Sequence, residues 1–116
     1  MATKNQIIEA VRTYIERDML PHAPTKTDRF VLRGASAALV LRPDFLFKAL
    51  ASNPIVSMLG AVDGDGNVDI QLLRELLPAA LGGETIDVHF KVFPWDVEEC
   101  GFSLGAEDVK KIFTYM

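Results

Sequence analysis

The chain has 116 residues, of which 49% are hydrophobic and 24% charged, and its formal net charge is −4. This length suits a single globular domain over 1–116, and this composition excludes a disordered chain. The apolar runs are too short to span a bilayer, the N-terminal segment lacks a continuous apolar stretch, and one cysteine, Cys100, cannot form an intrachain disulfide. We therefore expect a cytoplasmic protein with no membrane partner.

The first helix is predicted from a capping-box spacing between Thr3 and Gln6. The apolar residues that follow recur at the spacing of one helical face: Ile7, Ile8, Val11, Tyr14, Ile15 and Met19. Pro21 and Pro24 then end the helix, because neither can donate a backbone hydrogen bond.

The segment 28–41 is predicted to be a central, buried helix. Every residue from Ala35 to Leu41 is small or apolar, and a helix that is apolar on all sides is typical of a protein interior. Small side chains at helical spacing allow other backbones to approach closely; these are Gly34, Ala37 and Ala38, followed by Leu41. Thr27 or Asp28 is the expected N-cap, and the helix should end at Arg42 before Pro43. We expect the other helices to pack around it.

Two short helices should follow, starting at Pro43 and at Asn53-Pro54. A fifth helix, capped by Asp69, is predicted to bury five residues: Ile70, Leu73, Leu76, Leu77 and Ala80. Pro78 should kink or stop this helix, and Gly82-Gly83 should terminate it.

The pattern changes at Glu84 to an alternation of apolar and polar residues that is typical of a half-buried strand. We expect an antiparallel hairpin of strands near 85–92 and 101–104, followed by a helix from about Ala106. The segment 66–70 resembles the one at 101–104, and pairing of the two would give a third strand; coincidence is the favoured explanation of so short a match. The fold class is therefore α+β, a mainly helical body with a small hairpin near the C-terminus.

A glycine-rich segment, AVDGDGNVDIQLL from Ala61 to Leu73, resembles a calcium loop. With Gly66 at the sixth loop position, oxygen ligands would come from Asp63, Asp65 and Asp69. The first loop position is Ala61 and the twelfth is Leu72, so the bidentate carboxylate of such sites is missing. We expect a turn that leads into an Asp-capped helix and no specific metal site; weak cation binding is the alternative.

Catalytic chemistry has few candidates. His22 and His89 lack further ligands at zinc-site spacing, and His89 beside Asp87 is a common strand pattern rather than a catalytic pair. Glu98 and Glu99 adjoin Cys100 and disfavour its thiolate. The sequence contains no nucleophile elbow, phosphate-binding loop or dinucleotide-binding glycine pattern. We expect neither a cofactor nor enzymatic activity.

Two surfaces are candidates for binding. Phe93 and Trp95 lie at the hairpin tip, where exposed aromatics would anchor a partner; alternatively Trp95 covers the core. Four basic residues near the central helix are a candidate nucleic-acid surface: Lys26, Arg29, Arg33 and Arg42. The acidic net charge repels phosphate, and a buried segment flanked by Arg33 and Arg42 is the competing explanation of two of these residues. A nucleic-acid-binding module is therefore kept as the alternative function.

Charge is unevenly distributed along the chain. Residues 1–48 hold eight basic and five acidic residues, a net +3, whereas 49–116 hold four and eleven, a net −7. Such a polar molecule with an apolar anchor at Phe93 and Trp95 favours self-association, and closed symmetry favours a homodimer.

Four segments resemble small uncharacterised proteins encoded by bacteriophages and bacterial prophages: MLPHAP, SNPIVSML, GNVDIQLLRELL and GFSLGAEDVKKIFTYM. This resemblance implies a role in infection or particle assembly, in the cytoplasm of a bacterial host or on the virion, and it transfers no catalytic or binding residue. The expected function is that of a non-enzymatic interaction or assembly accessory protein.

Overall fold

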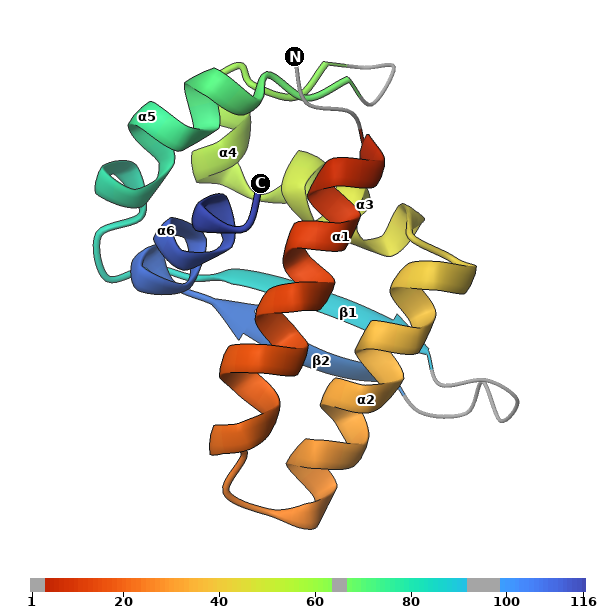
Figure 1. The fold of residues 1–116 in the computed structure, drawn as a ribbon. Coiled ribbons are helices and arrows are strands. Elements are labelled where there is room, and N and C mark those ends of the chain that lie inside the picture. Colours follow the sequence, from red (N-terminus) through yellow and green to blue (C-terminus); the bar gives the residue numbers. More distant parts are fainter. Residues whose placement is uncertain (1–3, 64–66, 92–98) are drawn as a thin grey trace.

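A computed structural model describes residues 4–63, 67–91 and 99–116 of the chain (Figure 1). The helical part opens with α1 (Lys4–Tyr14), a π-helical segment η1 (Ile15–Met19) and a 3-10 turn η2 (Leu20–His22). Four helices and then a hairpin with a last helix follow in order: α2 (Lys26–Leu41), α3 (Asp44–Ser52), α4 (Pro54–Met58), α5 (Ile70–Leu81), β1 (Ile86–Lys91), β2 (Glu99–Leu104) and α6 (Ala106–Thr114). The predicted α+β fold, with its hairpin near the C-terminus, is confirmed.

The hairpin has one buried and one exposed face. β1 and β2 pair antiparallel, with Ile86 opposite Leu104 and Lys91 opposite Glu99. Along β1 the side chains alternate between buried and exposed, as the sequence pattern predicts. β2 begins at Glu99, two residues before the predicted start. Val92 lies outside the described residues.

The helices cover the buried face of the hairpin. In Figure 1, α1 and α2 run side by side in opposite directions across the two strands. α4, α5 and α6 lie on the other side of α1 from α2. α2 contacts both strands, α3 packs on β1, and α6 packs on α1, α5 and β2. The buried side chains of all these elements form one hydrophobic cluster, with Ile15, Val56 and Val88 among its fully buried members.

The prediction that the helix over 28–41 is buried on all sides is wrong. Its buried side holds Leu32, Ala35, Ser36, Ala38 and Leu39, whereas Phe30, Ala37, Val40 and Leu41 are exposed. α2 packs on α1, η1, η2 and the hairpin, while α5 packs on α4 and α6. The other helices are thus arranged around the hairpin and α1, and α2 lies at one side of the molecule (Figure 1).

Local hydrogen bonds set where the helices begin. The N-cap of α2 is Thr25 rather than Thr27 or Asp28, because the Thr25 Oγ1 accepts a bond of 3.0 Å from the Asp28 backbone amide. The predicted caps of α4 and α5 are correct: Asn53 Oδ1 accepts from Ile55 N at 2.9 Å, and Asp69 Oδ1 accepts from Leu72 N at 3.1 Å. The proposed Thr3 cap of α1 lies outside the described residues.

The predicted end of α5 at Gly82-Gly83 is confirmed, because the helix runs past Pro78 to Leu81 and Gly82, with a φ of 57°, ends it; of the two predicted effects of Pro78, a stop does not occur. Its buried residues are Ile70, Leu73, Leu77 and Leu81, so the predicted burial of Leu76 and Ala80 is wrong. Leu76 and Ala80 each lie one residue before a buried leucine and are therefore rotated toward solvent.

The suggested third strand is also absent from the described residues. Val68 forms a single antiparallel bridge with Val62, and the described part of the sheet contains only β1 and β2. Within the same residues, no helix is long and apolar enough to cross a membrane.

Candidate interaction surface on helix α2

One face of α2 is exposed and largely apolar. We call it the outer face; it consists of Phe30, Arg33, Ala37, Val40 and Leu41, which recur at the i, i+3, i+7, i+10 and i+11 spacing of one side of a helix. The exposed fractions of its three large apolar residues are 56% for Phe30, 58% for Val40 and 70% for Leu41. Large apolar groups that share an exposed face mark sites of interaction.

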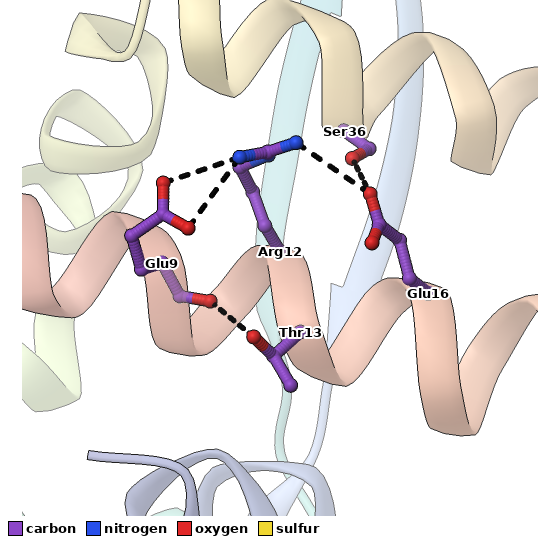
Figure 2. Close-up of polar contacts among 5 residues, drawn as sticks. All are labelled: Glu9, Arg12, Thr13, Glu16 and Ser36. Carbon is purple, nitrogen blue, oxygen red and sulfur yellow. Dashed lines mark hydrogen bonds and ion pairs between the residues drawn. The ribbon is translucent and has the colours of Figure 1, made fainter.

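A polar contact joins α2 to η1 on the side of α2 opposite this face. Figure 2 shows Ser36 of α2 donating to Glu16 Oε1 at 2.7 Å, while Arg12 bridges Glu16 at 3.6 Å and Glu9 at 3.1 Å. Ser36 is buried and lies at the edge of the side that packs on α1. The outer face is turned away from the core because the opposite side of α2, with Leu32, Ala35 and Leu39, packs into it, and the Ser36–Glu16 bond lies on that packed side.

A groove lies beside the outer face at its C-terminal end. We call it the α2–α3 groove; it has a volume of about 540 Å³, and it is lined by Ala38, Leu41, Arg42, Pro43, Asp44, Phe45, Lys48, Phe90 and Lys91. The rings of Phe45 and Phe90 lie 5.5 Å apart between their centroids. Arg42 donates to the Lys91 carbonyl at 3.1 Å and so joins α2 to β1. The groove is thus apolar with a mainly basic rim.

A second groove, the α2–β2 groove, lies near the N-terminal end of α2 and has an acidic lining. Its charged residues are Asp18, Asp28 and Asp108, and His22 contributes to the wall. Tyr14 donates to Asp108 across this groove, and Tyr115 donates to Asp18 at 2.5 Å. Burial and the bond to Asp108 raise the pKa of Tyr14 well above its usual value. These two bonds tie α6 to α1 and η1.

Two of the three candidate calcium ligands, Asp63 and Asp69, accept hydrogen bonds from nearby residues of the chain. Asn67 donates its backbone amide to Asp63 Oδ1 at 2.9 Å and its side-chain amide to Asp63 Oδ2 at 3.0 Å. Asp69 is occupied as the cap of α5, and Asp65 lies outside the described residues. The described loop is therefore a turn closed by Asp63, followed by an Asp-capped helix.

The candidate pair of His89 and Asp87 does not form a hydrogen bond within the part of the chain that the structure describes. Asp87 instead accepts from Ser103 Oγ at 2.7 Å and from Thr85 Oγ1 at 3.0 Å. These two bonds, and to a smaller degree the charge of His89, lower the pKa of Asp87. Both residues lie on the exposed face of the hairpin, and Asp87 serves there as an acceptor that links Ser103 and Thr85.

Cys100 is half-buried and packs against the core. Glu98 and the aromatic pair Phe93 and Trp95 lie outside the described residues, so the predicted apolar anchor at the hairpin tip has no structural description. The side chain of Glu99 is likewise not described.

The four basic residues of the candidate nucleic-acid surface lie in different environments. Arg33 lies exposed on the outer face rather than beside a buried segment, and Lys26 is exposed one turn before Phe30. Arg29 is half-buried and donates to the Ala23 carbonyl at 3.4 Å. Arg42 is exposed at the rim of the α2–α3 groove.

Sequence reasoning missed the outer face, although its helical spacing is present in the sequence. The run of small and apolar residues from Ala35 to Leu41 concealed that spacing, because its one polar residue, Ser36, lies on the buried side and none marks the solvent side. Comparison of the chain with protein-family models, curated proteins and solved structures found no match.

Proposed function

We propose that this protein is a non-enzymatic interaction protein that binds a protein partner through the outer face of α2. The observation that carries the proposal is the clustering of exposed apolar groups. Among the described residues, five large hydrophobic side chains are exposed, and three of them, Phe30, Val40 and Leu41, share the outer face. Scattered exposed apolar residues are normal, but a shared helical face is a recurrent docking surface.

Burial of the outer face alone does not supply enough free energy for stable binding. Complete burial of a Val, Leu or Phe side chain contributes roughly 1.5–3 kcal/mol, so these three partly exposed groups supply on the order of 4 kcal/mol. Association costs about 4–15 kcal/mol in lost translational and rotational freedom. A partner must therefore also occupy the adjacent α2–α3 groove, whose aromatic lining of Phe45 and Phe90 supplies further apolar contact.

The non-enzymatic part of the proposal is supported by how the chemistry-bearing residues are used. Asp63, Asp69 and Asp87 each accept hydrogen bonds that stabilise a turn, a helix end or the hairpin. We further propose a role in infection or particle assembly, in a bacterial cytoplasm or on the virion, which is the role that the resemblance of the sequence to phage and prophage proteins implies.

A nucleic-acid-binding module remains the alternative function. Lys26, Arg33, Arg42 and Lys48 are all exposed on or near α2, which favours contact with phosphates. The net charge of −4 opposes it. A gel shift that weakens steeply with added salt and disappears in Arg33→Ala would establish this alternative instead.

Site-specific photo-crosslinking tests the proposed function. A photoreactive amino acid replaces Val40 on the outer face, and a matched chain carries it at Met58, which is 80% exposed on α4. We expect a crosslinked protein from position 40, whether a second copy or another protein in host extract, and its loss when Leu41→Asp is added. Equal crosslinking from positions 40 and 58, or none from position 40, would contradict the proposal.

A further inference from the structure

We infer that the partner of the outer face is a second copy of this chain, joined through an antiparallel pair of α2 helices in which Phe30 of each copy enters the α2–α3 groove of the other. This inference rests on the proposed function, because it names the occupant of the same surface. It replaces the hairpin tip as the anchor of self-association. Three features of α2 carry it: the position of an apolar knob and a groove, the position of two charges, and the small residues between them.

The knob and the groove are arranged for reciprocal insertion. A two-fold axis beside Ala37 places residues equally far before and after it opposite one another. Phe30 of one copy then lies beyond the partner's Leu41, where α2 ends and the groove lined by Leu41, Phe45 and Phe90 begins. Phe30 and Leu41 are eleven residues apart, about three helical turns, so both lie on the same side of α2. Each copy therefore offers one knob and one groove, and the symmetry uses both twice.

Two opposite charges are placed for the same arrangement. Arg33 and Asp44 are both exposed, and within the described residues neither side chain has a hydrogen bond or ion pair. About the axis at Ala37, Arg33 lies opposite the partner's Leu41, the last residue of α2, and Leu41 and Asp44, the first residue of α3, both line the α2–α3 groove. The Arg33 guanidinium of each copy thus reaches toward the Asp44 carboxylate of the other. This gives two reciprocal ion pairs across one interface.

The centre of the outer face permits close approach of the two helices. Ala37 is exposed at the axis, and Gly34 lies opposite the partner's Val40. Small residues at a crossing point let two backbones approach, so that Val40 packs over a glycine rather than against a larger side chain. The exposed Leu41 then packs beside the partner's Phe30.

The expected dimer is weak. α2 has sixteen residues and is therefore about 24 Å long, so a strip roughly 10 Å wide covers about 240 Å² per copy. A standard interface buries about 800 Å² per partner. Even with Phe30 in the groove, the dimer belongs to the small, transient class, and it should form and dissociate with concentration.

Light scattering over a concentration series, with charge-reversal variants, tests the inference. We expect wild type to dimerise in the micromolar range, and we expect Arg33→Asp and Asp44→Arg each to weaken the dimer about tenfold by placing like charges opposite one another. An equimolar mixture of the two single variants should dimerise again, because each interface then contains two opposite-charge pairs. Glu84→Arg, an exposed charge reversal after α5, is the matched control and should leave the dimer unchanged. Circular dichroism confirms that each variant is folded.

Two outcomes would overturn the inference. One is a wild type that stays monomeric at high micromolar concentration in low salt. The other is a mixture of Arg33→Asp and Asp44→Arg that dimerises no better than either variant alone. In either case, a crosslink from position 40 to a different protein would leave the proposed function standing, so the two failures are distinguishable.

Discussion

The Asp108 side chain both caps helix α6 and joins that helix to α1. It accepts the backbone amide of Gly105 at 2.8 Å, which caps α6, and it also accepts the hydroxyl of Tyr14 from α1. The position of α6 is therefore coupled to α1 by a bond made in the first turn of α6. The tyrosine must be protonated to donate this bond, which makes the contact sensitive to alkaline pH.

We predict that Tyr14→Phe lowers the free energy of unfolding by about 1 kcal/mol near neutral pH, because a largely buried hydrogen bond is lost. The pKa of Tyr14 in the folded protein is raised above its ordinary value of 10.0. The contribution of Tyr14 is therefore fully present below that value and is lost as pH rises through the folded pKa.

Urea denaturation at about pH 8 and about pH 11 measures this effect, since the two conditions bracket the ordinary tyrosine pKa. The stability difference between wild type and Tyr14→Phe should shrink at the higher pH. Tyr115→Phe, which removes the neighbouring bond to Asp18, serves as the comparison. A difference for Tyr14 that is constant with pH would contradict the assigned role.

At the level of single residues, the sequence predicts caps well where one candidate stands alone. Asn53 and Asp69 cap their helices as expected because each precedes a clear apolar pattern. For α2, Thr25, Thr27 and Asp28 compete, and the choice of Thr25 depends on its contact with Asp28 three residues later. That spacing is a helix-start signal in the sequence, and its neighbours conceal it.

At the level of elements, α2 shows what periodicity cannot decide. A run of apolar residues is compatible with burial on every side or on one side, and the choice depends on which neighbours the rest of the chain supplies. Here α1 and the hairpin cover only one side of α2. β1 could be predicted from the sequence because its side chains alternate strictly between apolar and polar. The start of β2 could not, because Glu99 and Cys100 carry no clear strand pattern.

Two leucines of α2 provide a matched test of this one-sided burial. Leu39 is 1% exposed, and we expect Leu39→Ala to lower the free energy of unfolding by roughly 2–5 kcal/mol, because it leaves a cavity. Leu41 is 70% exposed, and Leu41→Ala should change stability by no more than about 0.5 kcal/mol in dilute monomer.

Chemical denaturation at low protein concentration is the measurement for both leucine variants. Dilution keeps any association of the outer face from adding to the apparent stability. Similar losses for Leu39→Ala and Leu41→Ala would mean that α2 is buried on both sides, and the outer face would not exist.

At the level of the whole molecule, the exposed apolar groups of α2 and the two exposed charges of Arg33 on α2 and Asp44 on α3 have one common explanation. The outer face has helical spacing, an adjacent groove and a pair of charges arranged about Ala37, and together these features fit a symmetric contact. The sequence suggested self-association from the charge difference between its halves, but it could not locate the contact. That location depends on which side of α2 the tertiary fold leaves uncovered.

Paramagnetic broadening between two copies tests the proposed contact most directly. A spin label is attached at Lys26→Cys, in a Cys100→Ala background, and this chain is mixed with isotope-labelled wild type so that only intermolecular effects are observed. The axis at Ala37 places Lys26, the first residue of α2, beyond the end of the partner's α2 at Leu41 and toward the partner's α3. We therefore predict broadening of amide signals around Asp44 and Lys48, and none around Leu76 on α5. Broadening centred on α5, or no broadening at any concentration up to the high micromolar range, would contradict the outer face of α2 as the interaction surface.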